Sequence, residues 1–366
     1  MDLAAHRDEV FHLELGEPGF PTPQHIQEAA TRAMKEGFTK YTPNAGLLSL
    51  RKSILRKVRE DNRIDAQLEQ IAVTPGSVFA LASALMAVAE PGDEVLIPDP
   101  GWPNYNMQAI VLGFRPVFYP LRQESGFRPM VEEIEPLLGS RTRAIVINTP
   151  SNPTGAVYPE ETIEELLDLA VRHDIFLISD ETYEKIVFDG SHSSPATLDP
   201  DGRVIAIYGF SKTYAMTGWR VAYYVAPREI APQMNKLIEP FVSCASSVSQ
   251  KAAEAALSGS QACVTEMVQA YRQRRDLVVD MLRAEGFEFF KPEGAFYLMV
   301  RIDKTGMDSY SFAKEVVQNT GAAVAPGTTF GPSAGPYVRL SFCAKSEEIE
   351  EGLKRFCRFY REKCRL

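Results

Sequence analysis

The sequence predicts an α/β fold in which helices cover a mostly parallel sheet of seven strands and a smaller α+β unit follows. Three observations support this prediction. From residue 70 onward, short apolar runs alternate with longer amphipathic segments, which is the order of parallel βαβ units. Several of these runs are apolar throughout, as expected for strands covered on both faces. After residue 280 the pattern changes to a few alternating strands and a terminal amphipathic helix.

The expected elements follow in order along the chain. Strands of the large sheet are expected at residues 71–73, 94–97, 116–119, 144–147, 176–178, 204–208 and 221–225. The helices between them include residues 78–89 and 159–173, and the smaller unit has strands at 296–300 and 337–342 and a helix at 346–362. We expect three parts: an N-terminal segment contributing to the small domain (1–40), a large domain (41–280) and a small C-terminal domain (281–366).

Composition favours a small-molecule partner. The 366 residues are 45% hydrophobic and 24% charged, as in ordinary globular enzymes. A net charge of −9 gives no basic surface for nucleic acid or an anionic membrane. The first ten residues, MDLAAHRDEV, carry acids where a signal peptide has an apolar stretch, and no apolar run is long enough to span a bilayer. We therefore expect a cytoplasmic protein.

Cysteine and histidine usage argues against cross-links and metal sites. The five cysteines form no C-x-x-C pair and are odd in number, which favours free thiols in a reducing compartment. The five histidines show no ligand spacing, so no metal site is expected.

Polar residues follow the expected strands at their carboxyl ends, where open α/β sheets bind ligands. After the first strand, Gly76-Ser77-Val78 stands at a helix start and leaves backbone N–H groups for an anion. The other strand ends supply an aromatic ring, amides, a carboxylate, a phenol and two cations: Trp102, Asn148, Asn152, Asp180, Tyr183, Lys212 and Arg220. Pyridoxal phosphate fits this set, since it needs an anion site, a lysine for its aldehyde, an acid at its ring nitrogen and donors at its phenolic oxygen.

Each of these residues also has a purely structural explanation. Lys212 alone would be a solvated loop lysine, Asp180 a helix N-cap, Trp102 a core residue and Arg220 a surface ion-pair partner. Tyr183 and Asn152 are common in turns and cores. The functional interpretation rests on the whole set, because independent accidents rarely place all of them at strand ends in one chain.

The same residues lie in an ordered series of motifs: GEPGFPTP, YTPNAGLLSLR, VTPGSVFAL, DPGWPNY, NTPSNPTG, SDETY, FSKTYAMTGWR and YVRLSF. In this series the chain resembles the class I and II pyridoxal-phosphate-dependent aminotransferases, of fold type I and the aspartate aminotransferase superfamily. The resemblance runs from residue 16 to about residue 342. It implies an enzyme that moves an amino group from an L-amino acid to a 2-oxo acid by a ping-pong mechanism, as a homodimer with shared active sites.

The resemblance also implies roles for individual residues. Lys212 would bind the cofactor covalently, Asp180 would pair with its ring nitrogen, Tyr183 and Asn152 would hydrogen-bond its phenolic oxygen, and Trp102 would stack on its ring. The phosphate would be held by Gly76, Ser77, Val78, Ser211 and Arg220, with Tyr41 from the neighbouring subunit. The substrate would be bound by Arg339 at its α-carboxylate, by Asn152 and by the backbone of Gly16.

Two positions depart from the family's pattern. Gly209 stands where members commonly have a serine that contacts the phosphate, which predicts weaker cofactor binding. Val78 stands where aspartate-specific members often have a lysine for the side-chain carboxylate. This favours a neutral or aromatic donor, with 2-oxoglutarate as acceptor.

Three alternatives remain open on the sequence. A β-lyase on the same fold would share every cofactor contact. Residues 331–335, GPSAG, match the G-x-S-x-G nucleophile elbow of serine hydrolases, but a strand is expected after them where the elbow needs a helix. A ligand-sensing domain of a transcription regulator would need a DNA-binding module, for which no basic extension is present.

Overall fold

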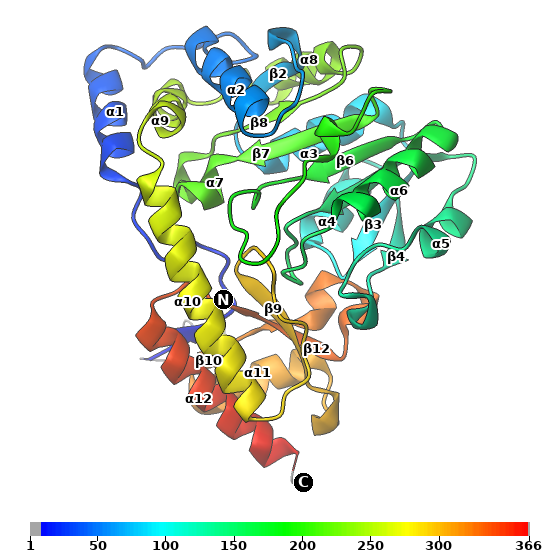
Figure 1. The fold of residues 1–366 in the computed structure, drawn as a ribbon, viewed down its shortest axis with the longest axis vertical. Helices are drawn as coiled ribbons and strands as arrows, with labels where there is room; N and C mark the ends of the chain where they lie inside the picture. Colours follow the sequence, from blue (N-terminus) through cyan, green and yellow to red (C-terminus); the bar gives the residue numbers. More distant parts are fainter. Residues whose placement is uncertain (1–8, 365–366) are drawn as a thin grey trace.

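The computed structural model describes residues 9–364. Its centre is a sheet of seven strands: β2 (Ile71–Thr74), β3 (Glu94–Asp99), β4 (Arg115–Pro120), β5 (Thr142–Asn148), β6 (Phe176–Asp180), β7 (Val204–Gly209) and β8 (Ala222–Val225). Their order across the sheet is β2-β8-β7-β6-β5-β3-β4 (Figure 1). Strand β8 runs antiparallel to both of its neighbours, and the other neighbouring pairs are parallel. The predicted mostly parallel sheet of seven strands is confirmed.

Side chains of the central strands alternate between two apolar layers. In β5, Ala144 and Val146 face one layer, while Ile145 and Ile147 face the other. The first layer is completed by α3 (Ser77–Val88), α4 (Pro103–Val111) and α8 (Ala231–Val242). The second is completed by α1 (Gln24–Lys35), α2 (Leu48–Glu60), α5 (Val131–Ile134), α6 (Glu160–Arg172) and α9 (Ser247–Ser258). Helices on both faces explain why the strands carry continuous apolar runs.

A smaller sheet lies beyond one end of the large one. It pairs β9 (Tyr297–Arg301), β11 (Ala325–Pro326) and β12 (Tyr337–Ser341) in antiparallel fashion. Around it pack α10 (Ala262–Ala284), α11 (Ser309–Thr320) and α12 (Ser346–Lys363). Figure 1 shows α10 running from beside the large sheet down to α12, so one long helix spans both parts.

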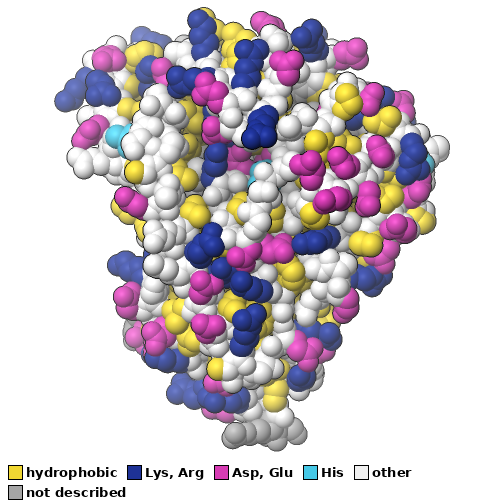
Figure 2. Space-filling model, viewed as in Figure 1, with side chains coloured by type: hydrophobic (Ala, Val, Ile, Leu, Met, Phe, Trp, Pro, Cys, Tyr) yellow, Lys and Arg dark blue, Asp and Glu magenta, His cyan; other side chains and the backbone are white. Residues whose placement is uncertain are grey.

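The N-terminal segment touches both parts. Strand β1 (Phe11–His12) pairs parallel with β10 (Ala322–Ala323) near the smaller sheet, whereas α1 packs against α9 beside the large one (Figure 1). The division at residues 40 and 280 stays a prediction. Among residues 9–364, no helix is both long enough and apolar enough to cross a membrane. Basic and acidic side chains are interspersed over the face shown in Figure 2.

Candidate active site

Three neighbouring strands end at the same edge of the large sheet. Asn148, the last residue of β5, lies opposite Asp180, the last residue of β6, and Asp180 lies opposite Ile207 of β7. Both polar residues belong to the strands, which are therefore longer than the predicted apolar runs. Strand β7 leads directly into α7 (Phe210–Thr213), which carries Lys212. Because these strands end in register, the Asn148 amide, the Asp180 carboxylate and the Lys212 amine lie at the same edge of the sheet.

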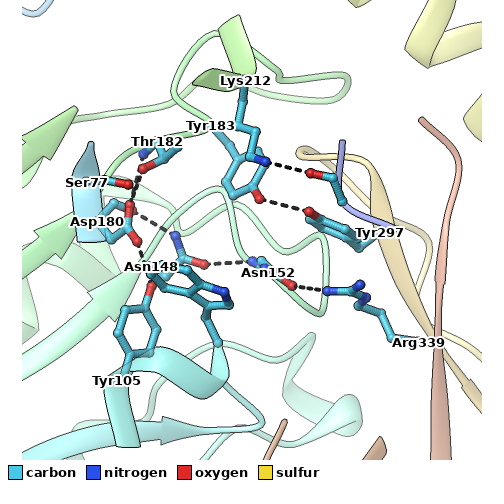
Figure 3. Close-up of a pocket in the computed structure, with 12 residues that line it drawn as sticks. Ser77, Tyr105, Asn148, Asn152, Asp180, Thr182, Tyr183, Lys212, Tyr297 and Arg339 are labelled. Atoms are coloured by element: carbon cyan, nitrogen blue, oxygen red, sulfur yellow. Dashed lines mark hydrogen bonds between the residues drawn. The ribbon is translucent and has the colours of Figure 1, made fainter. Parts of the chain in front are cut away.

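A cavity of about 280 Å³ opens at this edge. Nine of the residues expected at the strand ends or in the site line it: Gly16, Ser77, Trp102, Asn148, Asn152, Asp180, Tyr183, Lys212 and Arg339. Three further residues complete the lining: Tyr105, Thr182 and Tyr297 (Figure 3). Tyr41 lies outside the cavity of its own chain and is 88% exposed.

The Asp180 carboxylate is buried and held by three donors. Oδ1 accepts from the backbone N–H of Thr182 at 3.1 Å and from its hydroxyl at 2.6 Å, and Oδ2 accepts from the Tyr105 hydroxyl at 2.9 Å. Burial raises the pKa of Asp180, while these donors and nearby Lys212 oppose the rise. The donors fix the carboxylate in one orientation at the cavity wall.

Burial also acts on Lys212, which donates to the carbonyl oxygen of Gly16 at 2.6 Å. It lowers the pKa of the Lys212 ammonium to about 8, and the cations of Arg339 and Arg220 act in the same direction. An appreciable fraction of the amine is therefore neutral near physiological pH, as a nucleophile or general base requires.

Arg339 of β12 reaches the same cavity from the smaller sheet. Its guanidinium lies 4.3 Å from the ring centre of Tyr297 and 4.6 Å from that of Phe330. Nη1 donates to Oδ1 of Asn152 at 2.9 Å and Nη2 to the carbonyl oxygen of Glu14, while the buried Nε has no hydrogen-bond partner. A buried guanidinium with an unused donor fits a carboxylate ligand.

An anion cradle lies at the start of α3. This helix begins at Ser77 without a side-chain cap, so its first N–H groups are available to an anion. Gly76 has φ +93°, and a Cβ there would lie 2.6 Å from Nη2 of Arg220. Arg220 itself has left-handed backbone (φ +51°) and donates to the Thr217 carbonyl at 2.8 Å. The remaining expected phosphate contacts, Val78 and Ser211, lie in the first turn of α3 and next to Lys212 in α7.

Tyr183 and Tyr297 join the two sheets across the cavity. Their hydroxyl oxygens are 3.0 Å apart, and burial raises the pKa of both phenols, that of Tyr297 to about 12. Gly16 lies against the same ring, because a Cβ there would be 2.0 Å from the Tyr297 hydroxyl oxygen. Any side chain at residue 16 would therefore displace Tyr297.

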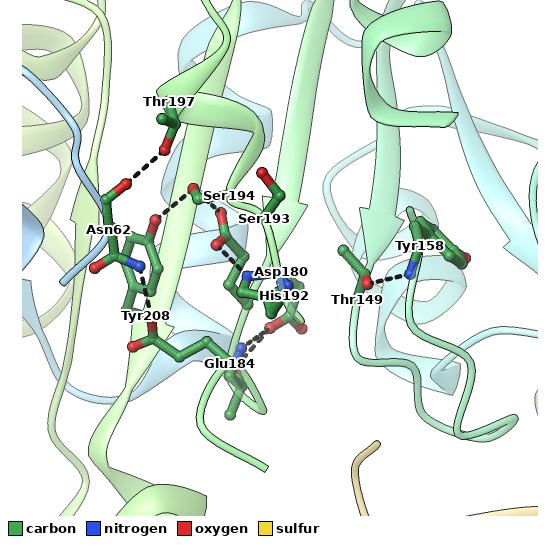
Figure 4. A network of polar contacts seen from close by, with 12 residues as sticks. Asn62, Thr149, Tyr158, Asp180, Glu184, His192, Ser193, Ser194, Thr197 and Tyr208 are labelled. Atoms are coloured by element: carbon green, nitrogen blue, oxygen red, sulfur yellow. Dashed lines mark hydrogen bonds and ion pairs between the residues drawn. The ribbon is translucent and has the colours of Figure 1, made fainter. Parts of the chain in front are cut away.

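Buried polar contacts anchor the turn that carries Asp180 and Tyr183. Lys57 forms an ion pair with Glu184, whose other oxygen accepts from Asn62 at 2.7 Å. Glu181 accepts from the Ser194 hydroxyl at 2.9 Å and lies 2.8 Å from Nε2 of His192. Figure 4 labels Ser194 and His192 in this network. The turn is thus fixed on its inner side by charged and hydrogen-bonded groups.

Sequence reasoning missed Tyr105, Thr182 and Tyr297. Tyr105 and Thr182 stand inside the motifs DPGWPNY and SDETY, so a search for donors to Asp180 within those motifs would have found them. Tyr297 lies in an apolar strand that gives no polar signal. Ser333 of the GPSAG motif donates its hydroxyl to Asp99 at 2.8 Å, and strand β12 follows the motif in place of the helix of a nucleophile elbow.

Comparison with known proteins agrees with the fold. The family model for aminotransferase class I and II matches residues 8–356. The chain is 39% identical to the aromatic-amino-acid aminotransferase 2 of Thermococcus litoralis and 40% identical to the aspartate aminotransferase of Pyrococcus abyssi, over 99% of this chain and 94% of each relative. It superimposes on the aromatic aminotransferase of Pyrococcus horikoshii with a TM-score of 0.94 at 40% identity, covering 99% of this chain and 98% of that one.

The lowered pKa of Lys212 predicts its reactivity in protein freed of small ligands. Because only the neutral amine is acylated, the rate of Lys212 acetylation should rise with pH and level off above a midpoint near 8. Peptide mass spectrometry after brief exposure to an acylating reagent measures this rate. Lys304, whose pKa is raised by Glu288, serves as control and should show no plateau over the same range. A Lys212 midpoint at or above its ordinary value would contradict the assigned environment.

The buried ion pair of Lys57 with Glu184 predicts that removing one charge destabilises the protein more than removing both. Glu184→Ala leaves the Lys57 ammonium buried without its ionic partner and should lower the free energy of unfolding by about 3–5 kcal/mol. Urea denaturation measures this change. The double variant Lys57→Met/Glu184→Leu removes both charges and should cost less. Equal losses in the two variants would show that the pair is not electrostatically buried.

Proposed function

Because the chain belongs to the class I and II aminotransferases, we propose that it transfers the amino group of an L-amino acid to a 2-oxo acid, with pyridoxal phosphate as cofactor and in two ping-pong half-reactions. One observation carries the proposal. A lysine with lowered pKa, a buried carboxylate held by three donors and an arginine with an unused donor surround a single cavity.

The residues present fit this cofactor. The uncapped start of α3 and Arg220 would bind its phosphate, and Gly76 leaves the space that a side chain would fill. Asp180, held by Tyr105 and Thr182, would accept a hydrogen bond from the ring nitrogen, with Trp102 on the ring face. Tyr183 and Asn152 would bind the phenolic oxygen, and Lys212 would be the point of covalent attachment. Pyridoxal phosphate, when bound, supplies an aldehyde for the amino group and a ring that stabilises negative charge at the substrate Cα.

Lys212 has the properties of the proton carrier. With a pKa of about 8, its amine could accept the Cα proton near neutral pH as a general base and release it again as a general acid. Burial, together with nearby Arg339 and Arg220, disfavours the ammonium, so the amine can both take up and release a proton near neutral pH. Burial raises the pKa of Asp180, and its three donors oppose this rise and so favour the charged form that a partner for a protonated ring nitrogen requires.

Arg339 would bind the substrate α-carboxylate. Its unpaired Nε offers a donor, and Asn152 holds the guanidinium through Nη1. Lys212 and Arg339 are the basic side chains in the cavity lining contributed by residues 9–364, which supports a neutral or aromatic donor. The relatives named above include both an aromatic and an aspartate enzyme. The acceptor would be 2-oxoglutarate.

A homodimer is part of the proposal. Tyr41 is 88% exposed and lies outside the cavity of its own chain, which leaves its hydroxyl available to the phosphate site of a second copy.

Absorption spectroscopy tests the function. Purified protein should show a visible cofactor band that bleaches on addition of a single suitable amino acid and returns with a 2-oxo acid, and Lys212→Ala should abolish turnover. A panel of neutral, aromatic and acidic amino acids identifies the donor. Release of pyruvate and ammonia from a β-substituted amino acid, without need of a 2-oxo acid, would favour the β-lyase instead. Failure of the wild-type protein to acquire a band with added pyridoxal phosphate would refute the cofactor assignment.

Arg339→Lys should weaken substrate binding selectively. Lysine keeps the charge but loses the bidentate geometry, so the KM for amino acids should rise roughly 10- to 100-fold, the equivalent of about 1.5–3 kcal/mol for a charged hydrogen bond. Cofactor affinity, measured by equilibrium dialysis, should stay within about twofold, because the site of Arg339 lies on β12 and not at the phosphate cradle. A parallel loss of cofactor would contradict the assignment to the substrate carboxylate.

A further inference from the structure

Two loops far apart in the sequence are fastened together beside the active-site cavity. One runs from Asp99, the last residue of β3, to Trp102, and the other runs from Phe330 to Ser333 before β12. The backbone N–H of Ser333 donates to both carboxylate oxygens of Asp99, at 3.2 and 3.0 Å, and its hydroxyl donates to Oδ1 at 2.8 Å. We call these contacts the Asp99 clasp. They tie the large sheet to the smaller one.

The Asp99 clasp is closely fitted. Gly331 has φ +139°, and a Cβ at this position would lie 2.1 Å from Oδ1 of Asp99. The backbone N–H of Gly101 donates to the carbonyl oxygen of Phe330 at 2.7 Å, which closes the two loops from the other side. Asp99 is 7% exposed, so its carboxylate lies within this pair of loops and depends on Ser333 for its donors.

The clasp lies beside a second cavity of about 480 Å³, which is lined by Trp102, Phe330 and Gly331 among others. Phe330 is 4% exposed and belongs to the apolar core, so its ring is held by packing as well as by the clasp. The Phe330 ring covers Arg339 at 4.6 Å and forms one of its two aromatic neighbours. The polar contacts of Asp99 add to this packing, and to the Gly101 hydrogen bond, in holding the loop that carries this ring.

We infer that Asp99 is a positioning residue for recognition of the substrate carboxylate: by holding Ser333, it keeps Phe330 over the guanidinium of Arg339. Asp99 acts through Phe330 and does not itself contact substrate. The inference rests on the proposed function only in assigning Arg339 to the substrate. It also gives the GPSAG motif a structural role, because Gly331 and Ser333 form the half of the clasp that receives the carboxylate.

A double-mutant cycle tests the inference. Asp99→Ala and Phe330→Ala should each raise the KM for the amino acid donor roughly 3- to 30-fold, the range of a desolvated cation–π contact, with kcat within about twofold. The double variant should have a KM no higher than that of Phe330→Ala, because Asp99 acts through that ring. A KM that rises in the double variant by the product of the two single effects would overturn the inference.

A control and a measurement independent of catalysis complete the test. Asp93→Ala removes a carboxylate immediately before the other end of the same strand, where it pairs with Arg143 at 3.2 Å, and should leave the KM unchanged. Hydrogen exchange of residues 328–336, measured without substrate, should be faster in Asp99→Ala than in Asp93→Ala. Unchanged exchange in Asp99→Ala, or an unchanged KM in an active variant, would overturn the inference.

Ser333→Ala covers the case in which Asp99→Ala does not fold. It removes the hydroxyl donor and keeps both backbone contacts, so a smaller rise in KM and a smaller acceleration of exchange are expected. The absence of both changes would overturn the inference. If the wild-type protein does not transaminate, the proposed function fails, and the exchange comparison still decides whether the clasp exists.

Discussion

The active site is organised around a carboxylate buried at the end of a central strand. Burying the charge of Asp180 costs free energy unless donors compensate it, and the chain supplies them from two directions. Thr182 belongs to the turn that follows β6, and Tyr105 belongs to α4. The ion pair of Lys57 with Glu184 anchors the turn that follows β6. Stabilising one carboxylate therefore fixes the turn that also carries Tyr183, and it fixes the start of the helix next to Trp102.

A buried cation, Arg339, and a partly buried one, Lys212, face the same cavity, and backbone carbonyls accept hydrogen bonds from both. Arg339 donates to the carbonyl oxygen of Glu14, and Lys212 donates to that of Gly16. Both acceptors lie in one short N-terminal stretch, which therefore brings the two cations together. The carboxylates of this stretch, Glu14 and Glu17, favour the charged forms of Arg339 and Lys212. The remaining positive potential suits a ligand with carboxylate and phosphate groups, although the chain as a whole carries a net charge of −9. The same arrangement lowers the pKa of Lys212, because burial and the nearby cations both favour the neutral amine.

The sequence predicts the part of the site that depends on one sheet. Asn152, Asp180 and Lys212 follow consecutive parallel strands, and a shared edge is a general property of such strands, so their proximity can be expected without a structure. The contacts between the two sheets could not be predicted in this way. Tyr297 lies in an apolar strand, and nothing near it in the sequence indicates that its hydroxyl meets Tyr183 and excludes a side chain at residue 16. The strand expected after GPSAG already argued against a nucleophile elbow at Ser333, but its actual partner, Asp99, lies 234 residues away and could not be predicted.

Under the proposed function, cofactor binding depends on contacts within the large sheet, whereas substrate binding depends on contacts between the two sheets. The groups assigned to the cofactor, Asp180 and Lys212, both extend from the large sheet, so its rigid core determines their spacing. Arg339, the group assigned to the substrate carboxylate, extends from the smaller sheet. Its hydrogen bonds to Asn152 and to the N-terminal stretch hold it in the cavity. A small shift between the sheets would therefore change substrate binding more than cofactor binding. Polar contacts that join the sheets, such as those of Asp99, are accordingly where substrate affinity can be adjusted without altering the chemistry.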